Sequence, residues 1–424
     1  MFCYPEILDD KSIYLFGYNK LAVIKKHLMR YLIILLFVLS SCKPSTDKKT
    51  ETKTFEEIHS QAIFIDTHND ILTVTMEKGF IMDNDLKGKT HSDLKRMKDG
   101  GLDVQFFSVW SDGNQINPYN FANRQIDSLD VVIKRNPDKI VKVANTEELL
   151  IAVGQNKIAA LIGLEGGHQI EDDLNKLDAF YNRGVRYMTL TWNNSTDWAT
   201  SASDEINNKD LKHKGLNSFG KKVIERMNNL GMMIDISHVG EQTFWDVIAN
   251  TTKPIIASHS SVHNICSHFR NLKDEQIKAI AKNEGVIQIN FNSPFIDPTV
   301  GNKEKAFLEK HKTEIDSNRQ SGMNPYLAEE SMYSKYREES DELKAPFNLV
   351  IEHIEYIVKL VGVDYVGIGS DFDGIVLPPK QLDDVTAFPL ITKALLEKGY
   401  SEKDIDKILG GNIIRVLKAN ELMK

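Results

Sequence analysis

Eight short apolar runs, most of them separated by a helix-like segment, constrain the fold of this chain more than any other feature. The runs are Ala62–Thr67, Val104–Trp110, Ile158–Leu164, Val185–Thr191, Met232–Ser237, Ile255–Ser258, Val286–Asn290 and Tyr365–Gly369. Nearly continuous apolar character is typical of parallel strands that are covered on both faces. Helices are expected at Asp173–Asn182, Ser218–Asn229, Glu241–Ala249 and Lys273–Asn283. This alternation predicts an α/β fold, a TIM-like (β/α)8 barrel, with a doubly wound open sheet as the alternative.

Two stretches exceed what a minimal barrel needs. Asn117–Leu150 is long for one crossover and is expected to hold more than one helix. Asp297–Leu343, between the seventh and eighth strands, is longer, polar and charged, with a helix expected at Lys303–Lys312. A connection of this length is usually functional or disordered. Two interpretations stay open: a lid over the substrate, and a surface insertion without a role in catalysis.

The end of the chain, from Ser401 to Lys424, is expected to be helical. Ser401 and Asp404 resemble a capping box in which Asp replaces the usual Glu. We expect Gly410 and Gly411 to break the helix before a final helix starts at Asn412.

Metal-binding residue types follow the first run, in the sequence D-T-H-N-D. It contains Asp66, His68 and Asp70. Residues two apart on a strand point to the same side, so His68 and Asp70 are placed to hold one ion together. An imidazole with a carboxylate suits zinc and similar divalent ions. The alternative is a solvated loop after a strand.

Four more candidates occupy the same position relative to their strands. They are Glu165, His238, His259 and Asp371. A lone histidine at a strand end is more often a hydrogen-bonded core residue, but barrel enzymes collect catalytic groups at these ends. The set suits two ions, one held by His68 and Asp70, the other by His238 and His259, with Glu165 bridging. Such a pair activates a bridging hydroxide, and Asp371 would transfer the proton.

Six motifs in this order resemble one family. They are D-T-H-N-D, G-L-E-G-G-H, R-Y-M-T-L-T, I-D-I-S-H-V, S-H-S-S and G-S-D-F-D-G. The chain is similar to the membrane (renal-type) dipeptidases, which are zinc peptidases of the amidohydrolase superfamily. The similarity runs from about Ala62 to about Leu417. It implies a barrel, a hydrolase acting on dipeptides, and two Zn²⁺ per chain.

The resemblance also implies roles for single residues. His68 and Asp70 would bind one zinc, Glu165 would bridge, and His238 and His259 would bind the other. Asp371 matches the family's acid–base residue, which also contacts substrate. Arg270, in S-H-F-R-N, matches the arginine that binds the substrate carboxylate. Without the family, Arg270 would be interpreted as a surface arginine.

One position departs from the family. Mammalian members carry a substrate-binding histidine after T-L-T, whereas this chain has Trp192. Tryptophan offers an N–H donor but no basic nitrogen, so substrate orientation and side-chain preference are in question there. His168, three residues after Glu165, is an alternative source of a substrate-binding histidine, but we interpret it first as a structural residue or as a partner of a metal ligand.

The first 57 residues predict export. Lys25, Lys26 and Arg30 precede the apolar run Tyr31–Leu39, and Leu39-Ser40-Ser41-Cys42 resembles a bacterial lipobox. We expect residues 1–41 to be a lipoprotein signal peptide, 42–57 a tether, and 58–424 the barrel. Lipidated Cys42 would anchor the protein to a bacterial membrane, in the periplasm or at the cell surface. The alternative is an ordinary signal peptide with an incidental cysteine.

The sequence therefore predicts a metallo-dipeptidase for small dipeptides, some with a D-residue at the C-terminus. The same centre acting on another amide, a lactam or a lactone is one alternative, and a non-catalytic peptide-binding lipoprotein is a second. A net charge of −8 gives no basic surface for nucleic acid. Contact with a membrane is expected only through the lipid anchor, and a homodimer stays open.

Overall fold

A nearly closed barrel forms the centre of the computed structural model, which describes residues 53–323 and 325–422. Eight parallel strands follow the order β1-β2-β4-β5-β6-β7-β8-β9, and β3 pairs with β4 outside this path. A parallel bridge between Asn69 and Phe372 links β1 to the chain just after β9. The strands are β1 (Ile65–Asn69), β2 (Val104–Trp110), β3 (Ile140–Lys142), β4 (Ile158–Glu165), β5 (Val185–Thr189), β6 (Met233–Asp235), β7 (Ile256–Ser260), β8 (Val286–Ile289) and β9 (Val366–Ile368). The predicted TIM-like barrel is confirmed, and the open sheet is wrong.

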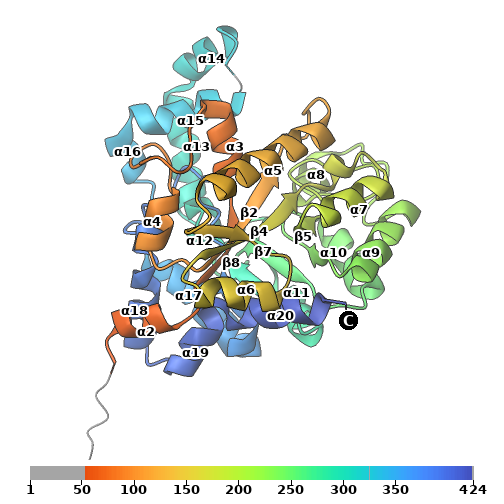
Figure 1. Cartoon of the computed structure of the whole chain (residues 1–424). Coiled ribbons are helices and arrows are strands. Elements are labelled where there is room, and N and C mark those ends of the chain that lie inside the picture. Colours follow the sequence, from red (N-terminus) through yellow and green to blue (C-terminus); the bar gives the residue numbers. More distant parts are fainter. Residues whose placement is uncertain (1–52, 324, 423–424) are drawn as a thin grey trace, which may run out of the picture. The chain divides into compact units, whose positions relative to one another are not determined.

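Helices surround these strands (Figure 1). The α-helices are α2 (Phe55–Gln61), α3 (Ile71–Lys78), α4 (Leu94–Asp99), α5 (Pro118–Arg135), α6 (Thr146–Gly154), α7 (Leu174–Asn182), α8 (Ala202–Asn207), α9 (Ser218–Leu230), α10 (Glu241–Asn250), α11 (Asp274–Lys282), α12 (Ser293–Ile296), α13 (Val300–Lys310), α14 (Lys312–Gln320), α15 (Pro325–Lys335), α16 (Arg337–Asp341), α17 (Asn348–Val361), α18 (Pro389–Glu397), α19 (Glu402–Asp406) and α20 (Asn412–Asn420). Three short 3-10 helices, η1 (Gly167–Ile170), η2 (Val363–Tyr365) and η3 (Val385–Ala387), and one π-helix, η4 (Lys407–Gly411), complete the set.

Each of the eight predicted strands is present, with bounds shifted by at most a few residues. The short strand β3 was not predicted. It lies in the long stretch 117–150, between α5 and α6, and contains only three residues. Since its Ile140 alone is fully buried, it lacks the long apolar run that identifies the barrel strands. The expectation of more than one helix around this stretch is confirmed by α5 and α6.

The insertion, residues 297–343, holds the helices α13 to α16. It has a small hydrophobic core of its own, separate from the two clusters of the barrel. This core also includes Leu377, in the segment that follows β9. Figure 1 shows α13 and α15 beside α3, and an ion pair of 2.9 Å between Lys78 of α3 and Glu330 of α15 joins the insertion to the barrel. The insertion is therefore fixed to the end of the barrel where β1 and β9 finish.

The predicted helix break at Gly410 and Gly411 is wrong, whereas the final helix predicted from Asn412 is confirmed by α20. Both glycines lie in η4, a π-helical turn that leads directly into α20. A Cβ atom at position 410 would lie 2.2 Å from the carbonyl oxygen of Ile63. The glycine is therefore needed for close packing on β1, and the wider turn keeps the helix continuous. The Ser401 cap is confirmed, because its side chain accepts from the backbone N–H of Asp404.

The predicted signal peptide and Cys42 lie outside the described residues. Residues 42–52 of the predicted tether also lie outside them. The first described helix, α2, begins at Phe55 with Thr54 as its N-cap. Among the described helices, none combines the length and the apolar character that crossing a membrane would require.

Candidate metal centre

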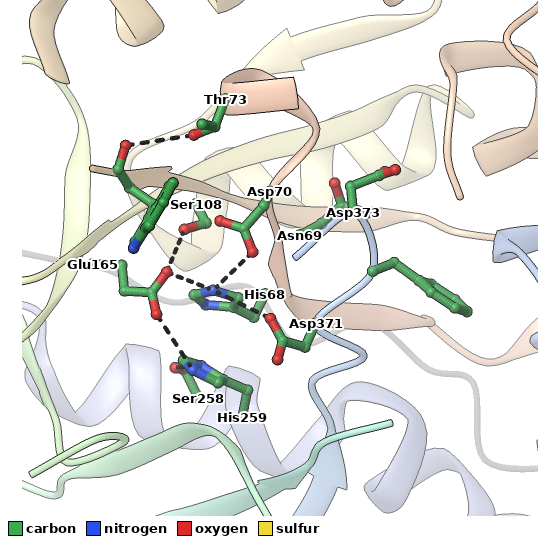
Figure 2. A network of polar contacts seen from close by, with 12 residues as sticks. His68, Asn69, Asp70, Thr73, Ser108, Glu165, Ser258, His259, Asp371 and Asp373 are labelled. Carbon is green, nitrogen blue, oxygen red and sulfur yellow. Dashed lines mark hydrogen bonds and ion pairs between the residues drawn. The ribbon is translucent and has the colours of Figure 1, made fainter. Parts of the chain in front are cut away.

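Polar side chains from five strands converge at the carboxyl end of the barrel. Each lies in the last residues of a strand or in the turn directly after it, where parallel strands deliver side chains to one face. Figure 2 shows His68, Asp70, Glu165, His259 and Asp371 pointing toward one another. The full set is His68 in β1, Asp70 after β1, Glu165 at the end of β4, His238 after β6, His259 in β7 and Asp371 after β9.

Glu165 lies between two groups of possible ligands. Its Oε2 atom is 3.1 Å from Nε2 of His68, and its Oε1 atom is 3.1 Å from Nε2 of His238. One group is His68, Asp70 and Glu165, the second is Glu165, His238 and His259, and in each the ligand atoms lie within 4.8 Å of one another. One carboxylate therefore serves both groups, one oxygen facing each.

Two backbone hydrogen bonds at this centre join the end of β1 to the segment that follows β9. The N–H of Asp70 donates to the carbonyl of Phe372 over 2.9 Å, and the N–H of Asp371 donates to the carbonyl of His68 over 3.1 Å. Asp371 and His238 have left-handed backbones, with φ of 62° and 64°. Residues other than glycine rarely adopt this conformation, and such strain is concentrated at functional sites. These turns direct both side chains into the centre.

Burial makes two of the histidines poor bases. It lowers the pKa of His238 to about 4, with the nearby positive charge of Arg270 adding to the effect. It likewise lowers the pKa of His259 well below the ordinary value, and His68 adds to this. Both imidazoles are neutral at physiological pH, so each retains a nitrogen lone pair, the form that binds metal ions.

In the other half of the centre, His68 is surrounded by negatively charged groups. Burial opposes the charged form of His68, yet Tyr187, Glu165 and Asp70 together raise its pKa well above the usual range. Burial would raise the pKa of Glu165, but the adjacent histidines, His68 foremost, lower it well below the usual range. In the absence of an ion, a proton on His68 balances the carboxylates, which is the charge that a cation would supply.

The donor set fits a metal ion. The Oδ1 atom of Asp70 is buried and has no hydrogen-bond partner among the described residues, and burial raises the pKa of this carboxyl. A buried carboxylate oxygen without a partner is unfavourable unless a cation binds it. Neutral imidazoles and carboxylates in this proportion are typical of zinc and related divalent ions.

Two buried groups that sequence reasoning missed hold the histidines from outside the centre. The hydroxyl of Tyr187 donates to the carbonyl of Thr67 over 3.0 Å and lies 2.8 Å from Nδ1 of His68. The hydroxyl of Ser258 lies 2.8 Å from Nδ1 of His259 and donates to Asp235 over 2.6 Å. Each histidine can therefore donate through Nδ1, which leaves its Nε2 lone pair facing the centre.

A glycine makes room for this support. A Cβ atom at Gly163 in β4 would lie 1.9 Å from the ring of Tyr187, so the ring fits only over a glycine. Tyr187 belongs to R-Y-M-T, Asp235 to I-D-I-S-H and Ser258 to A-S-H-S. Their proximity to the candidate ligands along the chain was the available signal, but the sequence does not say which neighbours point into the barrel.

Asp371 lies at the edge of the centre. Its Oδ2 atom accepts from the side-chain amide of Asn290 over 2.8 Å, and its Oδ1 atom is 3.9 Å from Nε2 of His68. Burial raises the pKa of Asp371 to about 8; the positive charge of His68 opposes the rise, and Asp70 and Glu165 reinforce it. A carboxyl group that gains and loses a proton near neutral pH is suited to general acid–base chemistry.

Asp66, the first acid of D-T-H-N-D, does not join the centre. Its side chain accepts from the backbone N–H of Ser370 over 2.8 Å, from the Ser370 hydroxyl over 2.7 Å and from Gln105 over 3.1 Å. It is fully buried and ties β1 to β2 and to the end of β9. Its place is structural, in support of the strand that carries His68.

Arg270 lies in the segment that follows β7, next to the metal-ligand candidate His259. Its Nη2 donates to the carbonyl of His259 over 3.1 Å, and its guanidinium packs over the ring of Phe295 at 5.5 Å. Its Nε is buried without a partner among the described residues. Burial lowers the pKa of Arg270 to about 10, against the opposing charge of Asp371. The sequence interpretation of a surface arginine is wrong, because only 5% of Arg270 is exposed.

A cavity of about 480 Å³ opens onto the centre, and the insertion forms part of its wall. Asp70, Glu165, His238 and Asp371 line it from the barrel. From the insertion, the lining residues are Glu304, Leu308, Leu327, Glu329, Glu330 and Tyr333. Arg270 lines a neighbouring cavity of about 370 Å³, which shares His238 with the first.

Trp192 lies in the wall of the larger cavity. Its ring packs edge-on against Trp110 at 5.0 Å and lies 6.5 Å from the ring of His238. His168 does not line either cavity; its Nε2 is 3.0 Å from the Ser111 hydroxyl, and burial lowers its pKa to about 4. Trp192 thus lines the cavity that opens onto the centre, whereas His168 lines neither of the two cavities.

Known proteins with similar sequences are dipeptidases. A family model described as membrane dipeptidase, peptidase family M19, matches residues 52–424. An uncharacterised dipeptidase of Schizosaccharomyces pombe is 32% identical over 400 residues, which cover 89% of this chain and 85% of that protein.

Solved structures share the fold. The probable dipeptidase PvdM from Pseudomonas aeruginosa is 25% identical, with a TM-score of 0.70 over 86% of this chain and 97% of that chain. A metallopeptidase from Rhodobacter sphaeroides, liganded with a phosphinate mimic of the dipeptide L-Ala-D-Ala, is 22% identical. Its TM-score is 0.69, over 85% of this chain and 100% of that chain.

Proposed function

The chain belongs to the membrane dipeptidase family, peptidase family M19, and we propose that this metallo-dipeptidase works with two zinc ions. His68 and Asp70 would hold one ion, His238 and His259 the other, and Glu165 both. The position of Glu165 supports this proposal most directly, because one of its oxygens lies 3.1 Å from Nε2 of His68 and the other 3.1 Å from Nε2 of His238. Two ions in such a site activate water near neutral pH and polarise the carbonyl under attack.

Asp371 is the residue that moves the proton. It would accept a proton when water attacks the peptide carbonyl and deliver it to the leaving amine, so that the amide C–N bond breaks and the amine leaves neutral. The hydrogen bond of 2.8 Å from Asn290 leaves one Asp371 oxygen toward His68 and the centre. The carboxyl is thereby oriented before substrate binds.

Arg270 and Trp192 are proposed to position the dipeptide. A buried guanidinium with an unused N–H binds a carboxylate strongly, which favours substrates with a free C-terminus. The indole of Trp192 offers one donor and an apolar face, and with Trp110 it forms an aromatic wall beside the centre. The insertion would cover the bound dipeptide, since two of its helices line the same cavity.

The substrate class follows from these groups together. We propose dipeptides with a free C-terminal carboxylate and a tolerated D-residue at that end, in line with the L-Ala-D-Ala mimic bound by the Rhodobacter sphaeroides relative. Hydrolysis of another amide, a lactam or a lactone at the same centre is the second candidate, because Trp192 changes the wall at a substrate-binding position.

The test uses metal-stripped protein, assayed with and without added Zn²⁺ on paired L,L and L,D dipeptides. We expect cleavage only after zinc is restored, and the ratio of the two rates gives the stereochemical preference. Bound zinc without cleavage of any dipeptide in the panel would contradict the substrate assignment and direct the search to lactams and lactones.

Export and lipid anchoring are proposed from the sequence alone. A lipoprotein signal is supported by the basic residues at positions 25–30, the apolar run Tyr31–Leu39 and the lipobox-like segment Leu39–Cys42. Expression in a bacterial host should place the protein in the membrane fraction, and Cys42→Ser should release it or leave it unprocessed. A Cys42→Ser protein that is cleaved and stays in the membrane fraction as the parent does would contradict the anchor.

A further inference from the structure

Each histidine of the centre has a hydrogen-bond partner on its outer ring nitrogen. For His68 and His259 the partners are Tyr187 and Ser258, as described above. For His238 the partner is the side-chain carbonyl of Asn193, 3.1 Å from Nδ1. An amide oxygen only accepts hydrogen bonds, so the proton of neutral His238 is on Nδ1.

The inner nitrogens of His238 and His259 then face each other as lone pairs. The two Nε2 atoms are 3.0 Å apart, and the Nε2 atom of His238 is also 3.1 Å from Oε1 of Glu165. Three acceptors this close repel one another unless a cation lies among them. The hydrogen bond from His238 to Asn193 therefore enforces the ring state in which this group of ligands binds a metal ion.

Asn193 differs from the other two partners in its surroundings. Tyr187 and Ser258 are fully buried within barrel strands. Asn193 is exposed, follows β5 in a loop, and lines the 480 Å³ cavity. It is thus the one partner of the three that lies in the wall of the substrate cavity.

The start of α8 holds Asn193 and His238 against each other. The hydroxyl of Ser201, the N-cap of α8, donates to the backbone carbonyl of Asn193 over 2.7 Å. The next residue, Ala202, donates its backbone N–H to the carbonyl of His238 over 2.8 Å. Because Ser201 is fully buried, this connection is sheltered from water, and the amide of Asn193 is kept within reach of the imidazole.

We propose that Asn193 is a positioning residue that sets the affinity of the metal ion bound by Glu165, His238 and His259. It does so by fixing the proton and the orientation of the His238 ring. The other ion, held by His68 and Asp70, does not depend on it. This inference rests on the two-ion centre proposed above.

The test measures the affinity of stripped protein for each Zn²⁺ ion by competition with a chelator. Asn193→Ala should weaken one ion by about 10- to 100-fold, the usual effect of losing such a partner, and leave the other unchanged. Asn193→Asp keeps an acceptor of the same size and should restore tight binding of both ions. Asn194→Ala removes the neighbouring amide, whose oxygen has no partner among the described residues, and should bind both ions as the parent does.

Three results would overturn the proposal: unchanged affinities in Asn193→Ala, equal weakening of both ions, or an equal loss in Asn194→Ala. Thermal unfolding of the stripped proteins reports whether each variant folds. If Asn193→Ala does not fold, Asn193→Leu, which keeps the size but lacks the acceptor, gives the same comparison with Asn193→Asp. Because the readout is zinc binding, a protein that binds two ions but cleaves no dipeptide would refute the proposed substrate without deciding this inference.

Discussion

The metal centre and the insertion face the same cavity but are held in place in different ways. The candidate ligands lie on or directly after four strands of one hydrogen-bonded sheet, β1, β4, β6 and β7, and are at most 9% exposed. The insertion reaches the cavity through α13 and α15, which rest on a small core of their own. Its link to α3 is a partly exposed ion pair, Lys78 with Glu330. Chemistry that depends on fixed distances is placed on the sheet, whereas the covering part is attached by weaker contacts.

The sharpest test of the centre is Asp371→Asn. The amide cannot accept the proton, so turnover should fall by about 10²- to 10⁴-fold, the range of general acid–base catalysis. Zinc content should be unchanged, and kcat on a dipeptide is the measurement. Asp373→Asn is the matched control two residues along, since Asp373 lines the same cavity but its side chain accepts from the backbone of His91 over 2.6 Å. Asp373→Asn should lower the thermal stability and leave turnover largely intact. Full turnover in Asp371→Asn would show that Asp371 takes no part in the mechanism.

Two glycine substitutions compare the regions directly. A Cβ atom at Gly374 would lie 2.2 Å from Oδ2 of Asp70 and 2.7 Å from Oδ1 of Asp371. Gly374→Ala should displace a metal ligand and lower zinc affinity or turnover by about 10- to 100-fold. In α13 of the insertion, a Cβ at Gly301 meets nothing within 4 Å.

Gly301→Ala is therefore the matched control. It should leave kcat unchanged and raise stability by about 0.5–1 kcal/mol, because alanine favours the helix. Equal losses of activity in the two variants, measured side by side, would contradict the distinction between a tightly fixed centre and a tolerant insertion.

Arg270→Ala separates binding from chemistry within the barrel. Loss of a charged hydrogen bond, worth about 1.5–3 kcal/mol, should raise KM by about 10- to 100-fold on dipeptides with a free carboxylate. On the same dipeptides with an amidated C-terminus, the variant and the parent should be equally poor. A loss of the same size on both substrates would argue that Arg270 acts on the fold and not on the carboxylate.

The pH dependence of the metal-free protein should also report on the centre. Burial raises the pKa of Asp371 to about 8, against about 3.9 in an unfolded chain. The folded state keeps a proton that the unfolded state loses, so stability falls as pH rises from about 4 to about 8. His238 has the opposite effect, but only below about pH 6.5, where the unfolded histidine takes up a proton.

The melting temperature of the stripped parent should therefore decline between pH 6.5 and 8, and less steeply in Asp371→Asn. Added Zn²⁺ should reverse the decline, because cations favour the charged carboxylate. Parallel curves for the stripped parent and the variant would show that Asp371 does not titrate in this range.

The smallest effect is expected where the insertion meets the barrel. Lys78→Ala removes the ion pair with Glu330 and should lower stability by no more than about 1 kcal/mol, as for other solvent-accessible pairs. The kcat should stay near that of the parent, and KM should change only slightly. A loss of kcat as large as that of Gly374→Ala would mean that the insertion takes part in assembling the centre.

The sequence was sufficient for the barrel and for the convergence of the candidate ligands. His68, Glu165 and Asp371 each follow an apolar run, and parallel strands in a barrel all end on one face. It could not separate Asp66 from its neighbours in D-T-H-N-D, because that depends on Ser370, which is distant in the sequence. It also missed Asn193, whose role depends on a contact between two loops.

The sequence was also insufficient to place the side chains of the insertion over the metal centre. The length and charge of residues 297–343 predicted an insertion, but not which of its side chains face the cavity. That depends on how α13 and α15 pack on Leu377 and its neighbours after β9. Conversely, Gly410 and Gly411 predicted a helix break. In the structure, Gly410 instead allows close packing of the helix on the backbone of Ile63.

We propose that Glu165 holds two zinc ions side by side, and diffraction data collected at the zinc absorption edge from crystals grown with Zn²⁺ would locate them. We expect two anomalous peaks about 3.5–4 Å apart, the usual spacing in two-metal sites. One should lie beside His68 and Asp70 and the other beside His238 and His259, each in contact with one oxygen of Glu165. A single peak, or two peaks that Glu165 does not join, would contradict the proposal.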